Sequence, residues 1–65
     1  MLLWQERVVA ERDELKEKLQ KLADFLDSPA WYVLDGTNQR LLEAQASAMS
    51  TYLSILNLRI SAFKE

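Results

Sequence analysis

Three side chains that could bind an anion or a polar ligand recur every seven residues near the end of the sequence. Gln45, Tyr52 and Arg59 supply an amide, a phenol and a guanidinium, and no charged residue lies between Glu43 and Arg59. A guanidinium on an apolar helical face requires an anion, either a carboxylate such as that of Glu11 or a ligand phosphate. The row is therefore either a polar network that fixes the register between subunits or a polar pocket at a subunit seam.

A second candidate set lies in the first part of the sequence, where Trp4, Glu11, Lys18 and Phe25 recur with the same spacing. Lys18 could contact a phosphate, and Trp4 could provide an aromatic surface on which a nucleobase stacks. The alternatives are that Lys18 and Glu11 extend to solvent beside an apolar seam and that Trp4 packs within the fold. The candidate ligand-binding residues are Trp4, Arg7, Lys18, Tyr52 and Arg59.

The composition argues against catalysis. The 65 residues include no Cys and no His, which removes thiolate metal sites and the commonest general base and metal ligand. A single Gly is too few for a Gly-rich phosphate loop, and the carboxylates of the first half alternate with Lys and Arg as on a solvated helix. We therefore expect a binding protein that is not an enzyme and has no catalytic residue, metal site or cofactor.

Charge and hydropathy restrict the partners. The net charge is −2 and the pI is near 5.0, so the sequence lacks the basic surface of a protein that binds DNA or RNA. No apolar run approaches the roughly 18 residues of a membrane span, and the first residues do not resemble a signal peptide. These features predict a soluble intracellular protein that binds neither a nucleic-acid polymer nor a membrane.

Two long helices would position the candidate residues. The run RVVAERDELKEKLQKLADFL contains strong helix formers and neither Gly nor Pro. Pro29 ends this helix, and Ser28 as N-cap with Pro29 at the first helical position predicts a short turn over PAWYVL. Gly36 then interrupts the chain, and Thr37 is the expected N-cap of a second helix from about Asn38 to Phe63.

The predicted architecture is one all-α domain, residues 1–65, in which the two helices form an antiparallel hairpin. Trp31 and Tyr32 are expected to pack and close the connector end. Because 49% of the residues are apolar, more than two helices can cover between themselves, we also expect self-association.

The second helix has an unusually wide apolar arc of roughly 160° on a helical wheel of about 100° per residue, more than a hairpin seam requires. Gln45, Tyr52 and Arg59 lie near the middle of this arc. The opposite side is small, polar and uncharged, which predicts that the second helix is central in an assembly and the first is outside it. Its residues are Ser47, Ser50, Ser54, Asn57 and Ser61.

The runs ERDELKEKLQKLADFL and LLEAQASAMSTYLSILNLRISAF together resemble a family of small phage proteins. The positions that carry the resemblance are Glu11, Glu14, Leu15, Lys18, Lys21, Leu22, Phe25, Leu41, Leu42, Gln45, Met49, Tyr52, Leu56, Arg59 and Ile60. They cover most of the chain, and the joint spacing of Gln45, Met49, Tyr52 and Arg59-Ile60 is the most specific part. The family is the helical-hairpin group of phage anti-CBASS proteins, which shares its hairpin with anti-Thoeris sponges.

The resemblance implies a phage sponge that binds cyclic dinucleotides or trinucleotides, or cyclic ADP-ribose isomers, without cleaving them. It implies a homo-oligomer, often a hexamer, in the cytoplasm of the infected bacterial host. Lys18 would contact cyclic dinucleotide phosphates, and Arg59 would contact cyclic trinucleotide phosphates near a symmetry axis. The family's stacking aromatic falls by strict spacing on Leu3, with Trp4 beside it. Gln45 and Tyr52 are expected to be mainly buried hydrogen-bonding partners.

A function from another class is also compatible with the sequence. The chain could be a helical adaptor or assembly module that grips a different protein through its wide apolar face. An adaptor would expose apolar surface, aggregate when purified alone and bind no nucleotide, which distinguishes it from a sponge.

Overall fold

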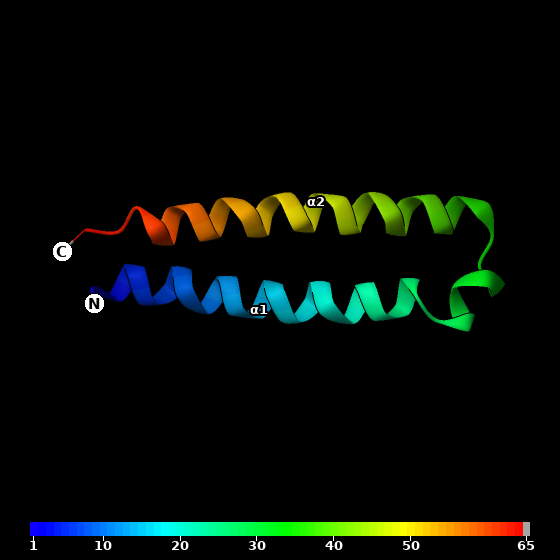
Figure 1. Cartoon of the computed structure of the whole chain (residues 1–65), viewed down its shortest axis with the longest axis horizontal. Coiled ribbons are helices and arrows are strands. Elements are labelled where there is room, and N and C mark those ends of the chain that lie inside the picture. Colours follow the sequence, from blue (N-terminus) through cyan, green and yellow to red (C-terminus); the bar gives the residue numbers. More distant parts are fainter. Residues whose placement is uncertain (65) are drawn as a thin grey trace.

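The computed structural model describes residues 1–64 and consists of two long antiparallel α-helices joined by a short 3-10 helix (Figure 1). Helix α1 spans Leu3–Leu26, the connector helix η1 spans Pro29–Val33 and helix α2 spans Gly36–Ser61. The hairpin measures 49 × 14 × 13 Å, with the two chain ends together at one end and η1 at the other. The predicted all-α hairpin is confirmed.

Helix α1 begins four residues before the expected run, at Leu3 rather than Arg7. The side-chain oxygen of Gln5 accepts a hydrogen bond from the backbone N–H of Leu2 at 2.9 Å, which satisfies a donor that the first turn leaves without a helical partner. At the other end, Ser28 holds the predicted cap position of η1, but its hydroxyl donates instead to the carbonyl of Phe25 at 2.6 Å. The Ser28 side chain therefore closes α1 and does not cap η1.

The predicted N-cap of α2 is wrong by two residues. The carboxylate of Asp35, not the hydroxyl of Thr37, accepts from the backbone N–H of Asn38 at 2.7 Å, and its second oxygen accepts from the Asn38 amide at 3.1 Å. Gly36 does not break the chain but is the first residue of the helix. An Asp carboxylate at the N-cap satisfies a free donor and also lies favourably at the positive end of the helix dipole.

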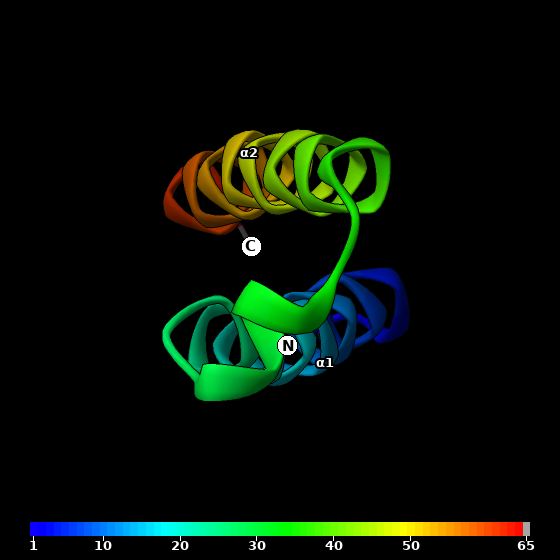
Figure 2. The ribbon, with the colours of Figure 1, turned by 90° about the vertical axis from the view of Figure 1, so that its right-hand side faces the viewer.

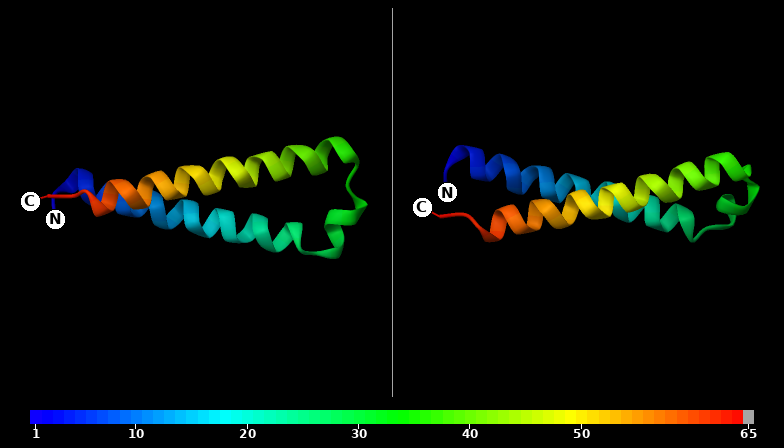
Figure 3. Two further views of the ribbon diagram at one scale, coloured as in Figure 1. Left: turned by 45° about the horizontal axis from the view of Figure 1, so that its top comes forward. Right: turned by 90° about the horizontal axis from the view of Figure 1, so that it is seen from above.

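The core is small and lies in the half of the hairpin that contains the chain ends. Val8, Leu15 and Leu56 are its buried apolar residues. The partly buried residues around them are Met49, Leu53, Ile60 and Phe63. The helix axes cross rather than run parallel, and in one view of Figure 3 they separate toward the connector. Packing is therefore tightest away from the connector.

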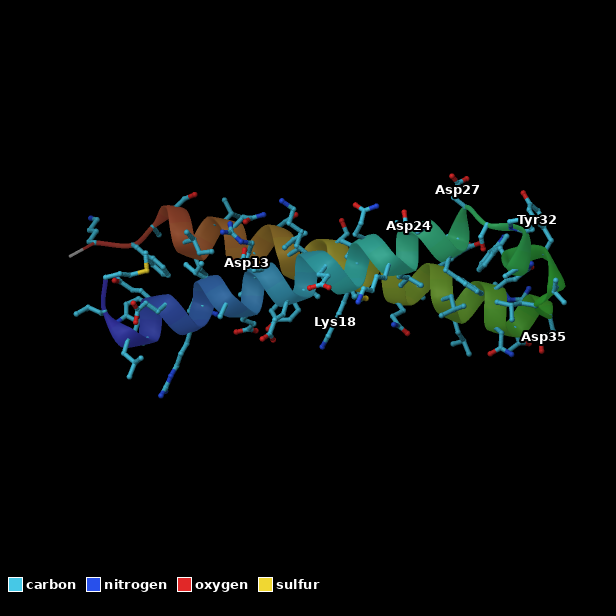
Figure 4. All side chains as sticks on the ribbon, turned by 90° about the horizontal axis from the view of Figure 1, so that it is seen from below. Asp13, Lys18, Asp24, Asp27, Tyr32 and Asp35 are labelled. Atoms are coloured by element: carbon cyan, nitrogen blue, oxygen red, sulfur yellow. The ribbon has the colours of Figure 1, made fainter. Side chains whose placement is uncertain are left out.

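The connector end is less closed than predicted. Trp31 is partly buried and its carbonyl accepts from the side-chain amide of Gln39 at 3.0 Å, so this residue does join η1 to α2. Tyr32, however, is 82% exposed, and its neighbour Val33 is exposed as well. The expectation that Tyr32 packs is wrong, because the short 3-10 turn directs its ring away from both helices (Figure 4).

Candidate functional site

Two contacts of α1, one with α2 and one with the segment that follows α2, distinguish the two long sides of the hairpin. On one side, the Arg12 guanidinium donates to the side-chain oxygen of Asn57 at 3.0 Å. On the other, the rings of Trp4 and Phe63 meet edge to face with centroids 5.1 Å apart. We call these the Arg12 side and the Trp4 side. Figure 2 looks along the hairpin from the connector end and shows the two helices nearly end-on. Each side is one of the two long edges along which the helices meet.

All five candidate ligand-binding residues belong to the Trp4 side. In α1, Arg7 lies one turn from Trp4, and Lys18 lies in the same seven-residue row as Trp4. In α2, Arg59 lies one turn before Phe63 and Tyr52 one further seven-residue step back. Two residues separated by three, four or seven positions share one face of a helix. The fold thus collects side chains that the sequence distributes over both helices.

The candidates form a strip rather than one compact cluster. Arg7 and Lys18 are separated along α1 by about 16 Å at 1.5 Å per residue. The Trp4–Phe63 contact shows which residues of the two antiparallel helices lie level with each other. Counting fourteen residues forward from Trp4 and fourteen back from Phe63 places Lys18 level with Met49. Tyr52 is one turn from Met49, so Lys18 and Tyr52 lie near each other across the two helices. The same register places Arg7 level with Ile60, next to Arg59. Figure 4 shows Lys18 extending from α1 on the side opposite to Asp27.

The three cations of the strip are available to an external anion. Arg7, Lys18 and Arg59 are exposed and form no ion pair with any residue among 1–64. In particular, Arg59 is not joined to Glu11, the internal carboxylate that the sequence offered as its partner. The strip is not purely basic, because Glu11 and Glu14 lie in the same part of α1.

Gln45 and Tyr52 are exposed within one chain rather than buried. The only hydrogen bond of the Gln45 side chain among the described residues is a 3.8 Å contact with the sulfur of Met49, and Tyr52 is 43% exposed. The apolar arc was read as one surface, but α1 covers only the part centred on Leu42, Leu53 and Ile60. The polar row lies at the edge of that contact, so its burial requires a second molecule.

Some apolar residues of α2 remain uncovered by α1; the sequence interpretation placed Leu41 and Ile55 in the wide apolar arc but overlooked Leu58. Ile55 is 49% and Leu58 is 69% exposed, and Leu41 is also exposed. The signal of Leu58 was present in the sequence as an apolar position on the far side of the helical wheel from the α1 contact. Gln5 was overlooked too, although it is 1% exposed and its amide also donates to the carbonyl of Lys64 at 3.3 Å.

Neither a cavity nor a group of acidic side chains that could hold a metal ion is present within residues 1–64. In the same range, no helix is sufficiently long and apolar to cross a membrane. The candidate strip is therefore an open surface along one side of a single hairpin.

Comparison with known proteins relates this hairpin to a phage family. Residues 3–62 match the model of the family described as Sequestin. The chain is also 38% identical over 64 residues to a protein of Enterobacteria phage T4, described as an uncharacterized 7.5 kDa protein in the denB-rIIB intergenic region. That alignment covers 98% of this chain and all of the T4 protein. No solved structure matches the chain.

Proposed function

The chain belongs to the Sequestin family, and on that basis we propose that it is a phage anti-defence sponge that sequesters cyclic oligonucleotide signals without cleaving them. The family name denotes sequestering, and the matching T4 protein comes from a phage. The ligands we propose are cyclic dinucleotides, cyclic trinucleotides or cyclic ADP-ribose isomers. The site of action would be the cytoplasm of the infected bacterium.

The observation that carries the proposal is the strip of exposed cations beside an exposed phenol. Arg59 and Lys18 have no carboxylate partner among residues 1–64, so a ligand phosphate can take that place with charge-assisted hydrogen bonds. Tyr52 offers a ring and a hydroxyl near Lys18. Flat bases and regularly spaced phosphates match such a strip better than a compact polar ligand does.

Self-association completes the proposed site. An open strip on one hairpin covers only one side of a ligand, whereas binding sites for small molecules usually bury most of the ligand surface. We propose a homo-oligomer, a hexamer in the fullest form, in which the strips of different copies face a common ligand. Repetition of Arg59 and Lys18 by symmetry concentrates positive charge at such a seam despite the net charge of −2.

The test is thermal unfolding in the presence of a panel of cyclic dinucleotides, cyclic trinucleotides and cyclic ADP-ribose isomers. A ligand that binds only the folded state at about 100 times its Kd stabilises it by about 2.7 kcal/mol. For a domain of this size that stabilisation raises Tm by roughly 10–20 °C. The linear form of each nucleotide serves as the matched control. The complex is then denatured, and the nucleotide should be recovered intact by chromatography, because a cleaved product contradicts a sponge.

An adaptor function is the second candidate, favoured by the exposed apolar residues at the connector. Tyr32 and Val33 lie far from the strip and would suit an apolar contact with another protein. A well-folded chain that shows no thermal shift with any nucleotide of the panel would reject the sponge and favour the adaptor.

A further inference from the structure

The face of α2 that points away from α1 carries two rows of residues with seven-residue spacing. The rows are Ala44, Thr51, Leu58 and Ala48, Ile55, Ala62. At about 100° per residue, all six lie within roughly 80° of one another, on the side of the helix opposite to Leu42 and Ile60. All six are exposed in the single chain. We call this surface the outward seam. Its spacing is that of a helix which packs along its length against a second helix.

The outward seam is suited to burial because its six residues carry no charge and its one hydroxyl, that of Thr51, already has a partner. No charged residue occurs from Ala44 to Leu58. Thr51 donates its hydroxyl to the carbonyl of Ser47 at 3.2 Å, and Ser54 on the flank donates to that of Ser50 at 3.1 Å. Burying a hydroxyl is costly mainly when its donor loses water without a new partner. Here the helix itself supplies the partner.

The distribution of side-chain size along the seam identifies the occupant. The first half presents the small residues Ala44 and Ala48, with Ser47 on the flank, whereas the second half presents Ile55 and Leu58. A second copy that runs antiparallel about a two-fold axis at Thr51 would place its Leu58 over Ala44 and its Ile55 over Ser47 and Ala48. Large side chains would then meet small ones at both ends, as a self-complementary two-fold contact requires. A parallel copy would oppose large to large and small to small.

The area of this face is close to what a stable dimer needs. A helix of 26 residues is about 39 Å long and about 11 Å wide, so half of its circumference presents on the order of 700 Å². A specific interface buries about 800 Å² of each partner. The outward face of α2 therefore presents an area of the same order, and the outward seam is the central part of that face.

We propose that two copies of this chain pack α2 against α2 in antiparallel orientation through the outward seam. The two-fold axis of such a pair is perpendicular to the plane that contains both helices. Residues that flank the seam on one side in one copy therefore lie on the same face of the dimer as their equivalents in the other copy. Tyr52 and Arg59 border the seam on the Trp4 side, so the two-fold axis brings the strips of both copies onto one face, with the two Tyr52 residues nearest the axis. The inference deepens the self-association included in the proposed function, and its relevance to ligand binding rests on that function.

Single-cysteine crosslinking tests the orientation directly, because the sequence has no native Cys. The variants are Ala44→Cys, Thr51→Cys and Leu58→Cys, each oxidised without nucleotide and analysed on a non-reducing gel. In the proposed dimer Thr51→Cys links to itself. Ala44→Cys and Leu58→Cys do not self-link, because like positions are about 21 Å apart along the axis, but they link to each other when mixed. Val33→Cys is the exposed control outside the seam and should remain monomeric on the gel.

Other crosslinking patterns would overturn the inference. Self-linking of all three seam variants would indicate a parallel pair. No seam crosslink, or crosslinking no greater than that of Val33→Cys, would show that the outward seam does not face a second copy.

A charge in the seam provides a second measurement. Leu58→Glu should reduce the solution mass, measured by light scattering, to half or less of the unsubstituted value, whereas Val33→Glu should leave it unchanged. Circular dichroism confirms that helicity is retained, and if Leu58→Glu does not fold, the crosslinking alone decides. An unchanged mass for folded Leu58→Glu would refute the interface. A chain that crosslinks as proposed but shows no thermal shift would retain the interface and lose the nucleotide function.

Discussion

The rings of Trp4 and Phe63 meet edge to face, with centroids 5.1 Å apart and an interplanar angle of 78°. This contact joins the start of α1 to the segment after α2, so Trp4 is part of the hairpin's own packing. The residue is nevertheless 52% exposed. The packing role that the sequence left as an alternative is therefore present, and a stacking role would be additional to it.

Replacing Trp4 should therefore reduce stability before it affects any ligand. We expect Trp4→Ala to lower the free energy of unfolding by about 1–2 kcal/mol, because an aromatic pair contributes about 0.5–1.5 kcal/mol beyond the area that it buries. Urea denaturation at fixed protein concentration measures the change. Tyr32→Ala, at an exposed ring in the connector, should change it by less than about 0.5 kcal/mol. Equal effects of the two substitutions would contradict the packing role.

Arg59 and Lys18 should show the opposite behaviour. Both side chains are exposed and have no ion pair among residues 1–64, so Arg59→Ala and Lys18→Ala should leave stability within about 0.5 kcal/mol. Each should weaken nucleotide binding by roughly 10- to 100-fold, since a hydrogen bond to a charged group contributes about 1.5–3 kcal/mol. Isothermal titration calorimetry measures the affinity. Lys16→Ala, an exposed lysine off the Trp4 side, is the matched control, and normal binding by both strip variants would reject the assigned site.

Gln5 should be more important for folding than its polar side chain suggests. It is almost fully buried and bonds the backbone of both Leu2 and Lys64. Gln5→Ala leaves those backbone groups without their side-chain partner, which should cost about 1–3 kcal/mol in thermal or urea unfolding. Gln20→Ala removes an exposed amide bonded to Asp24 and should cost less than about 0.5 kcal/mol. A Gln5 variant as stable as the Gln20 variant would show that water replaces both bonds without loss.

The N-cap of α2 offers a direct choice between two neighbouring residues. Asp35→Ala should destabilise the hairpin by about 1 kcal/mol, because it removes the acceptor of the Asn38 backbone N–H. Thr37→Ala should have a much smaller effect, since the Thr37 hydroxyl does not cap the helix. Thermal unfolding of the two variants side by side measures the difference. The reverse order of stabilities would restore Thr37 as the cap.

The hairpin could be predicted because its signals are local and repeated. Rows such as Val8, Leu15 and Leu22 establish the helical period. Pro29 prevents the first helix from continuing, whichever residue is its last. The caps were less predictable, because Asp35 and Thr37 are both good N-cap residues and the choice depends on which one the connector presents to the helix start. Gln5 could not be predicted as a capping residue, because the run that indicates the first helix begins at Arg7, after it.

The side of each helix that meets the other helix could not be read from the width of the apolar arc. An arc of roughly 160° accommodates both a hairpin contact and a second apolar surface, and the sequence does not divide it. The structure assigns Leu42, Leu53 and Ile60 to the first and leaves Ile55 to the second, which continues round the helix beyond the arc to Leu58. This division explains why Gln45, Tyr52 and Arg59, which lie near the middle of the apolar arc, are at the edge of the contact with α1.

The position of the core near the chain ends has a consequence for how quickly the hairpin forms. The contacts in this half of the hairpin join residues far apart in sequence. Examples are the Gln5–Lys64 hydrogen bond across 59 positions and the Arg12–Asn57 hydrogen bond across 45. Closing so long a loop costs entropy before these contacts can compensate for it. The connector end, which closes the shortest loop, has no buried residue to hold it. Folding should therefore be slower than for a hairpin packed at its turn, and a connector made stiffer by substitution should accelerate it.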